Sequence, residues 1–199
     1  MAGIRRIASV RCERTAVLVC DIQERFRDVI MGFESLVRSS SFLVRSASTL
    51  GVPVVVTEQY PKVFKKTVPD VLVPEAKVFE KTRFSMCTDE VKAHLETLEC
   101  EAVILCGLEA HVCVLQTTLD LLELGIAVHV CADAVSSQRE FDRSVALKRL
   151  ADSGAAISTS ESLVFQLVGD AAHPNFKALQ PLIKENAAAA AAASALLRW

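Results

Sequence analysis

Short runs of apolar, β-branched residues alternate with longer stretches of helical periodicity along most of the chain. The apolar runs predict six strands, at residues 15–21, 52–57, 76–81, 101–107, 126–133 and 155–160. Most of these runs are almost continuously hydrophobic, which is typical of strands buried on both faces of a parallel sheet. Apolar positions three and four residues apart predict helices at residues 33–51, 88–99, 113–123, 139–154 and 160–170.

This alternation predicts an α/β fold. We expect a three-layer α/β/α architecture around a six-stranded parallel sheet, Rossmann-like, with strand order 3-2-1-4-5-6. Residues 58–75 interrupt the pattern with three prolines and several lysines, so we expect a long loop that helps to shape a site.

The length and composition favour one domain. At 199 residues and 51% hydrophobic content the chain can bury one substantial core, which we assign to residues 1–186. An alanine-rich tail follows at 187–199. The tail predicts a frayed terminal helix, and the alternative is an oligomer contact through Leu196, Leu197 and Trp199.

Charge and cysteine content narrow the partners and the compartment. The net charge of −2 is spread along the chain, so we expect neither a nucleic acid nor a membrane as partner, but a small-molecule substrate. No apolar run is long enough to span a membrane. Seven cysteines without a CxxC pair indicate reduced thiols and a cytoplasmic protein. The basic start of the chain leaves mitochondrial targeting open as an alternative.

Three polar residues follow or end predicted strands at the edge where open parallel sheets bind ligands. They are Asp21, Lys81 and Cys113. Cys113 comes just after a strand and opens a predicted helix, whose amide groups and dipole favour a thiolate. The same amides could hold an oxyanion. The alternative for Cys113 is a small buried hydrophobe.

A nucleophilic thiol needs a proton acceptor, and Asp21 is the best candidate. A carboxylate at the end of a buried strand needs a partner, which Lys81 could supply. The alternative is that Asp21 caps the next segment and Lys81 is solvated. His111 is a second candidate base for Cys113, although side chains so close in a turn point apart.

Several other residues have mainly structural interpretations. Cys20, Cys106 and Cys131 lie within strands and are predicted core residues, and Cys87 is expected to pack as well. Asp133 ends a strand and is expected either to support the site or to cap the following turn.

Three ordered motifs resemble the isochorismatase-like cysteine hydrolase family. They are CDIQERF around Asp21, EKTRFS after Lys81 and GLEAHVCVLQTTLDLLELG around Cys113. The stretches TEQYPK, TVPDVL and STSESLVFQLVGDAAHPNFK are similar to the eukaryotic isochorismatase domain-containing proteins. The resemblance covers nearly the whole chain.

The resemblance implies a role for each matching residue. Cys113 would be the nucleophile and Asp21 the general acid and base. Lys81 would be the cation that lowers the pKa of both. It further implies a cis peptide bond between Leu108 and Glu109, an oxyanion hole made by the amides of Glu109 and Cys113, and a homo-oligomer, either a dimer or a tetramer. The substrate pocket would be lined by Phe26, Phe84 and Leu108.

Two departures from the family restrict the reaction. Nicotinamidases have an Asp-x-His metal motif after the second strand, where this chain has TEQYP, so we expect no metal and no other cofactor. Isochorismatases that cleave a vinyl ether lack the cysteine found here at position 113. We therefore expect hydrolysis of an amide or carbamoyl carbonyl through a thioester. The alternatives are a catalytically weak protein-interaction module of the same fold and a ribonuclease.

Overall fold

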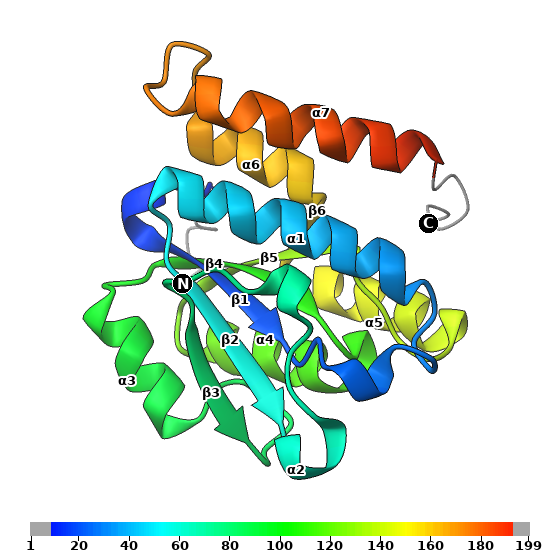
Figure 1. The fold of residues 1–199 in the computed structure, drawn as a ribbon. Coiled ribbons are helices and arrows are strands. Elements are labelled where there is room, and N and C mark those ends of the chain that lie inside the picture. The colour runs from blue at the N-terminus through cyan, green and yellow to red at the C-terminus, as the bar shows by residue number, and fades with distance from the viewer. Residues whose placement is uncertain (1–8, 193–199) are drawn as a thin grey trace.

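The computed structural model describes residues 9–192 and contains the predicted parallel sheet (Figure 1). All strand pairs are parallel and the order is β3-β2-β1-β4-β5-β6, as predicted. The strands are β1 (Thr15–Cys20), β2 (Val54–Gln59), β3 (Lys77–Lys81), β4 (Ala102–Gly107), β5 (Ala127–Val135) and β6 (Ala156–Ser158). β2 and β5 extend two residues beyond their predicted ends, and β6 is shorter than predicted.

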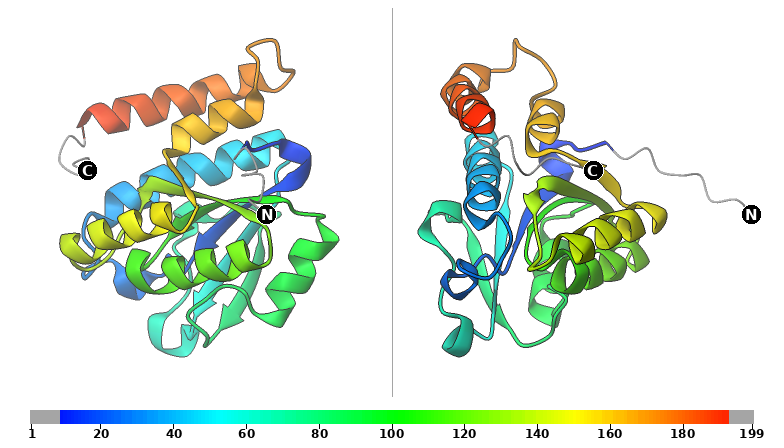
Figure 2. Two further views of the ribbon diagram at one scale, coloured as in Figure 1. Left: turned by 180° about the vertical axis from the view of Figure 1, so that it is seen from behind. Right: turned by 90° about the vertical axis from the view of Figure 1, so that its right-hand side faces the viewer.

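Helices cover both faces of the sheet (Figure 2). On one side lie α1 (Phe33–Leu50), α6 (Ser160–Val168) and α7 (Phe176–Ala192); on the other lie α3 (Asp89–Thr97), α4 (Leu115–Glu123) and α5 (Glu140–Asp152). Two core clusters fill the spaces between the sheet and these layers. Gly51 ends α1 at a φ of 72°, and the Thr88 side chain accepts a hydrogen bond from the Val91 amide at the start of α3.

The C-terminal helix begins before the alanine-rich stretch. The alanine run continues a helix that begins ten residues before position 186, at Phe176. Leu179 and Leu182 of α7 are buried in the core cluster that includes α1, and Arg45 forms an ion pair with Glu185 at 3.0 Å. Tertiary contacts therefore support the helix up to the alanine run. Leu196, Leu197 and Trp199, predicted as an oligomer contact, lie outside the described residues.

The segment 58–75 is also more ordered than predicted. It contains a short helix, α2 (Pro61–Phe64), and a 3₁₀ turn at Pro69–Val71. The buried Glu58 carboxylate accepts hydrogen bonds from the backbone amide and the hydroxyl of Thr67 and from Lys66. The segment is thus folded back over the end of the sheet.

The ends of β1 and β4 approach each other closely at Gly107. This residue has a φ of 125°, and an added Cβ would lie 2.1 Å from the Cys20 carbonyl oxygen. We expect Gly107→Ala to lower the free energy of unfolding by at least about 2 kcal/mol, because the backbone of β1 or β4 must move. Urea denaturation measures this, with Gly125→Ala, which meets no atom within 4 Å, as the control for positive-φ strain alone. Equal losses in both variants would contradict the steric explanation.

Candidate active site

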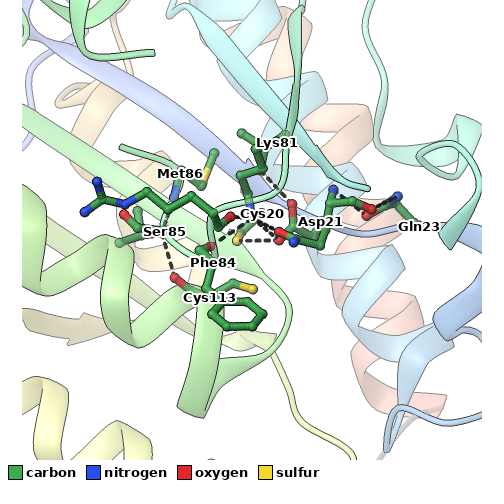
Figure 3. Close-up of polar contacts among 12 residues, drawn as sticks. Cys20, Asp21, Gln23, Lys81, Phe84, Ser85, Met86 and Cys113 are labelled. Carbon is green, nitrogen blue, oxygen red and sulfur yellow. Dashed lines mark hydrogen bonds and ion pairs between the residues drawn. The ribbon is translucent and has the colours of Figure 1, made fainter. Parts of the chain in front are cut away.

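The Asp21 carboxylate and the Lys81 ammonium form a buried ion pair at the carboxyl ends of β1 and β3 (Figure 3). Lys81 Nζ lies 2.7 Å from Asp21 Oδ2, and the side chains are 0% and 2% exposed, respectively. β2 lies between β1 and β3 in the sheet, so the pair spans three strands. The structure therefore brings together two of the three predicted polar residues in direct contact.

The turn that follows β1 aims the Asp21 side chain at this edge. Asp21 has a φ of 53°, which is uncommon for residues other than glycine and better tolerated by aspartate than by most. Its amide donates to the Thr57 carbonyl, and its own carbonyl accepts from Gln23 N at 2.8 Å. Non-glycine residues in this conformation cluster at functional sites.

The Lys81 ammonium donates to oxygen atoms only. Besides Asp21, its acceptors are the Gln59 side-chain oxygen at 2.6 Å and the backbone carbonyls of Arg83 and Phe84 at 3.1 and 2.8 Å. The segment after β3 thus wraps around the ammonium group. Since its donors are used within the protein, Lys81 is suited to act through Asp21 and its other neighbours rather than as an exposed substrate ligand.

Both members of the pair hold a proton more tightly than usual. Burial raises the pKa of Asp21, although Lys81, Thr57 and Cys113 favour its carboxylate form. For Lys81, burial lowers the pKa, but the neighbouring Cys20, Asp21 and Cys113 outweigh it and the net direction is upward. A lysine that stays charged beside an aspartate with a raised pKa suits proton transfer near neutral pH.

Cys113 lies next to this pair, but not at the first position of an α-helix as predicted. It is the fourth residue of a π-helical turn, Ala110–Val114, and α4 begins only at Leu115. Its side chain is close enough to favour the ionised form of Asp21, and the residue is 7% exposed to solvent. All three predicted residues therefore share one site (Figure 3).

The turn before Cys113 has irregular backbone hydrogen bonding. The bond between Leu108 and Glu109 is cis. The amides of Ala110, Val112 and Val114 each donate to a backbone carbonyl. Within residues 9–192 those of Glu109 and His111 donate to none, and that of Cys113 donates to none outside its own helical turn. The family resemblance assigns the amides of Glu109 and Cys113 to an oxyanion hole.

Sequence reasoning missed three residues that complete the site. The Thr57 hydroxyl donates to Asp21 Oδ1 at 2.8 Å, and the Cys20 thiol donates to Asp21 Oδ2 at 3.6 Å. Gln59 contacts Lys81 and also donates to the Thr82 carbonyl at 2.7 Å. Thr57 ends the predicted second strand, so the rule that identified Asp21 and Lys81 would also have identified it, whereas Gln59 lies two residues beyond that predicted end.

Gln23 ties the site to the folded segment beside it. Its side chain exchanges two hydrogen bonds with the backbone of Gln59 and also donates to the Lys65 carbonyl at 2.6 Å. The Gln23 side chain therefore fixes the end of β2 relative to β1. This explains in physical terms why the glutamine follows Asp21 at a spacing of two.

The three predicted pocket residues have different environments. Phe84 is 52% exposed, and its ring points toward Cys113 in Figure 3. Phe26 stacks on Phe64 of α2 with ring centroids 4.9 Å apart. Leu108 is 1% exposed and packs in the core cluster that includes α1. Phe84 is thus the best placed of the three to contact a molecule that approaches Cys113.

The competing candidates are engaged elsewhere. His111 Nδ1 contacts the Ser137 hydroxyl at 3.0 Å, and the Glu109 carboxylate accepts from both the amide and the side chain of Gln138. Asp133 accepts from the amide and the hydroxyl of Ser160, so it links β5 to the start of α6. None of these bonds reaches Cys113.

In residues 9–192 no group of three or more His, Cys, Asp or Glu side chains is arranged to hold a metal ion. None of the helices there has the length and hydropathy required to cross a membrane.

Comparison with known proteins gives consistent matches. The family model described as the Isochorismatase domain matches residues 15–162. The chain is 42% identical to isochorismatase domain-containing protein 2 of Xenopus laevis, over 94% of this chain and 92% of that protein. It is 43% identical to isochorismatase family protein 1B of Dictyostelium discoideum, over 92% of each.

A solved structure also matches closely. The MAR1 ribonuclease structure from Caenorhabditis elegans superposes with a TM-score of 0.86 at 44% identity, covering 89% of this chain and 93% of that one. The sequence and structural similarity thus extends well beyond the site residues.

Proposed function

Because this chain belongs to the isochorismatase family, we propose that it is a cysteine hydrolase that cleaves an amide or carbamoyl bond of a small molecule. Cys113 is the nucleophile, Asp21 the general acid and base, and Lys81 the cation that holds Asp21 in place. The observation that carries the proposal is the fully buried ion pair beside a thiol. Burying two charges gains a fold little stability, so a catalytic use accounts for the arrangement.

The first half of the reaction forms a thioester. Asp21 accepts the Cys113 proton, and the sulfur attacks the carbonyl carbon of the substrate. The amides of Glu109, which follows the cis peptide bond, and of Cys113 itself donate to the resulting oxyanion. Asp21 then gives its proton to the nitrogen as the C–N bond breaks, and ammonia or an amine leaves.

The second half regenerates the enzyme. Asp21 takes a proton from water, and the hydroxide attacks the thioester carbon. The second tetrahedral intermediate uses the same two amides. When it collapses, the C–S bond breaks, the acid product leaves and the Cys113 sulfur regains a proton from Asp21.

A substrate panel tests this proposal. We expect at least one small amide or carbamoyl compound to release ammonia with the wild-type protein, and Cys113→Ala to abolish the release because no thioester can form. Ammonia is measured by a coupled assay. A compound that Cys113→Ala hydrolyses at the wild-type rate would contradict the role of Cys113.

A ribonuclease is the second candidate, favoured by the 44% identity to the structure described as MAR1 ribonuclease. Neither the net charge of −2 nor the site chemistry explains how RNA would bind. Degradation of a labelled RNA that is equal in wild type and Cys113→Ala would favour a nuclease site elsewhere. Loss of that activity in the variant would instead place both reactions at Cys113.

A further inference from the structure

Cys20 brings a second thiol into the site that the proposed mechanism does not use. It ends β1 and is fully buried in the same core cluster as Cys113, whereas Cys106 and Cys131 belong to the cluster on the other face of the sheet. Its carbonyl accepts a hydrogen bond from Leu108 N at 2.8 Å. This bond fixes the end of β1 against the turn that leads to Cys113.

The two thiols lie beside the same charged pair. The Cys20 sulfur lies 3.6 Å from Asp21 Oδ2, Cys113 belongs to the same core cluster, and Figure 3 shows both thiols beside the Asp21 side chain. The same carboxylate oxygen lies 2.7 Å from Lys81 Nζ. The site therefore holds a dithiol, a proton acceptor and a fixed positive charge (Figure 3).

We propose that Cys20 is a resolving thiol, which forms a reversible disulfide with Cys113 after a hydroperoxide has oxidised Cys113. The inference shares with the proposed function the premise of a reactive Cys113, and otherwise goes beyond it. Reducing the disulfide restores both thiols.

The oxidation proceeds in two steps. After Asp21 has accepted the Cys113 proton, the thiolate attacks one peroxide oxygen, an S–O bond forms and the O–O bond breaks. The departing hydroxide takes that proton from Asp21 and becomes water. Asp21 then accepts the Cys20 proton, and the Cys20 sulfur attacks the Cys113 sulfur. The S–S bond forms, the S–O bond breaks, and the hydroxyl group leaves with that proton as a second water.

The environment of Cys20 separates the roles of the two thiols. Burial, followed by the contact with Cys113 and the charge of Asp21, raises the pKa of Cys20 well above its usual value. Cys20 therefore stays protonated at rest and does not react with peroxide first. It attacks only when the neighbouring sulfur has become electrophilic.

Peptide mapping tests the inference without a known substrate. The full chain is treated with a few-fold excess of hydrogen peroxide, free thiols are blocked with N-ethylmaleimide, and the protein is digested with trypsin and Glu-C. Cleavage yields residues 15–24, which contain Cys20 alone, and residues 110–123, which contain Cys113 alone. We expect these two peptides to be linked, and the link to disappear with dithiothreitol.

The variants Cys20→Ser and Cys20→Ala provide a second test of the resolving role. Without the resolving thiol, Cys113 should proceed to sulfinic acid, and dithiothreitol should no longer restore its alkylation by iodoacetamide. Cys87→Ser is the matched control, since Cys87 is a buried thiol of the same core cluster whose sulfur lies near the Thr117 carbonyl. This variant should form the linked peptide as the wild type does.

Two results would overturn the inference, and they differ in what they say about the proposed function. Wild-type Cys113 that reaches sulfinic acid with no link to Cys20 removes the resolving role and leaves the reactive Cys113 intact. Cys113 that resists peroxide and also alkylates no faster than a free thiol removes both proposals. If both Cys20 variants fail to fold, the wild-type peptide map alone decides.

Discussion

Lys81→Met should lower the free energy of unfolding by about 3–5 kcal/mol, because it leaves the Asp21 carboxylate buried without its cation. Methionine preserves most of the side-chain volume, so the change isolates the charge. The Asp21 side chain is only 2% exposed and cannot recover hydration by a small movement. Urea denaturation at neutral pH measures the loss.

Two further variants make this result specific. Lys148→Met removes a lysine that pairs with Asp152, and because their side chains are 78% and 66% exposed it should cost about 1 kcal/mol or less. Asp21→Asn combined with Lys81→Met removes both charges and should be more stable than Lys81→Met alone. A Lys81→Met protein as stable as the wild type would show that the pair is not an ion pair in solution.

Asp21→Asn should reduce turnover of any substrate found by the panel about 10²–10⁴-fold, because the amide cannot accept the Cys113 proton. The pH profile gives a second readout. Since burial raises the pKa of Asp21, the wild-type kcat/KM should increase with pH across a range above that of an ordinary aspartate, as the carboxyl loses its proton. Asp21→Asn should lose this dependence.

The matched control is Asp133→Asn. Asp133 also lies in a strand, but it accepts from Ser160 at the start of α6. Its replacement should affect stability and leave both the turnover and the pH profile close to wild type. An Asp21→Asn enzyme whose kcat/KM still falls at low pH as that of the wild type does would contradict the assignment of Asp21 as the base.

The sheet and the three main site residues could be predicted from the sequence because each rests on a strong local signal. Continuous β-branched runs identify buried parallel strands, and polar residues at their ends mark the ligand-binding edge. Asp21, Lys81 and Cys113 are the residues that this rule selected. The family motifs then supplied their expected roles and the cis bond between Leu108 and Glu109.

The errors came from weaker signals. β2 was predicted to end at Thr57, so the side chain of Gln59 was not considered as part of the strand end. Cys20 looked like a core residue and is one, but the strand alternation also turns it toward Cys113. The proximity of Cys20 to Cys113 depends on the packing of β1 against the turn after β4, which no local pattern encodes.

The helices show the same limit. The π-helical turn Ala110–Val114 shifts Cys113 from the first to the fourth position of a helical segment, and hydrophobic periodicity does not distinguish the two. In α7, Pro181 lies inside the helix, and packing of Leu179 and Leu182 in the core offsets its cost.

The most direct test of the account is the alkylation rate of each cysteine by iodoacetamide at neutral pH, resolved by mass spectrometry. Exposure alone ranks Cys12 and Cys100, which are partly exposed, ahead of the buried Cys113. The account predicts the reverse order, with Cys113 at least about tenfold faster than a free cysteine and slowed in Asp21→Asn and Lys81→Met. If Cys12 or Cys100 reacts first and Cys113 reacts as an ordinary buried thiol, the site is not catalytic and the fold serves as an interaction module.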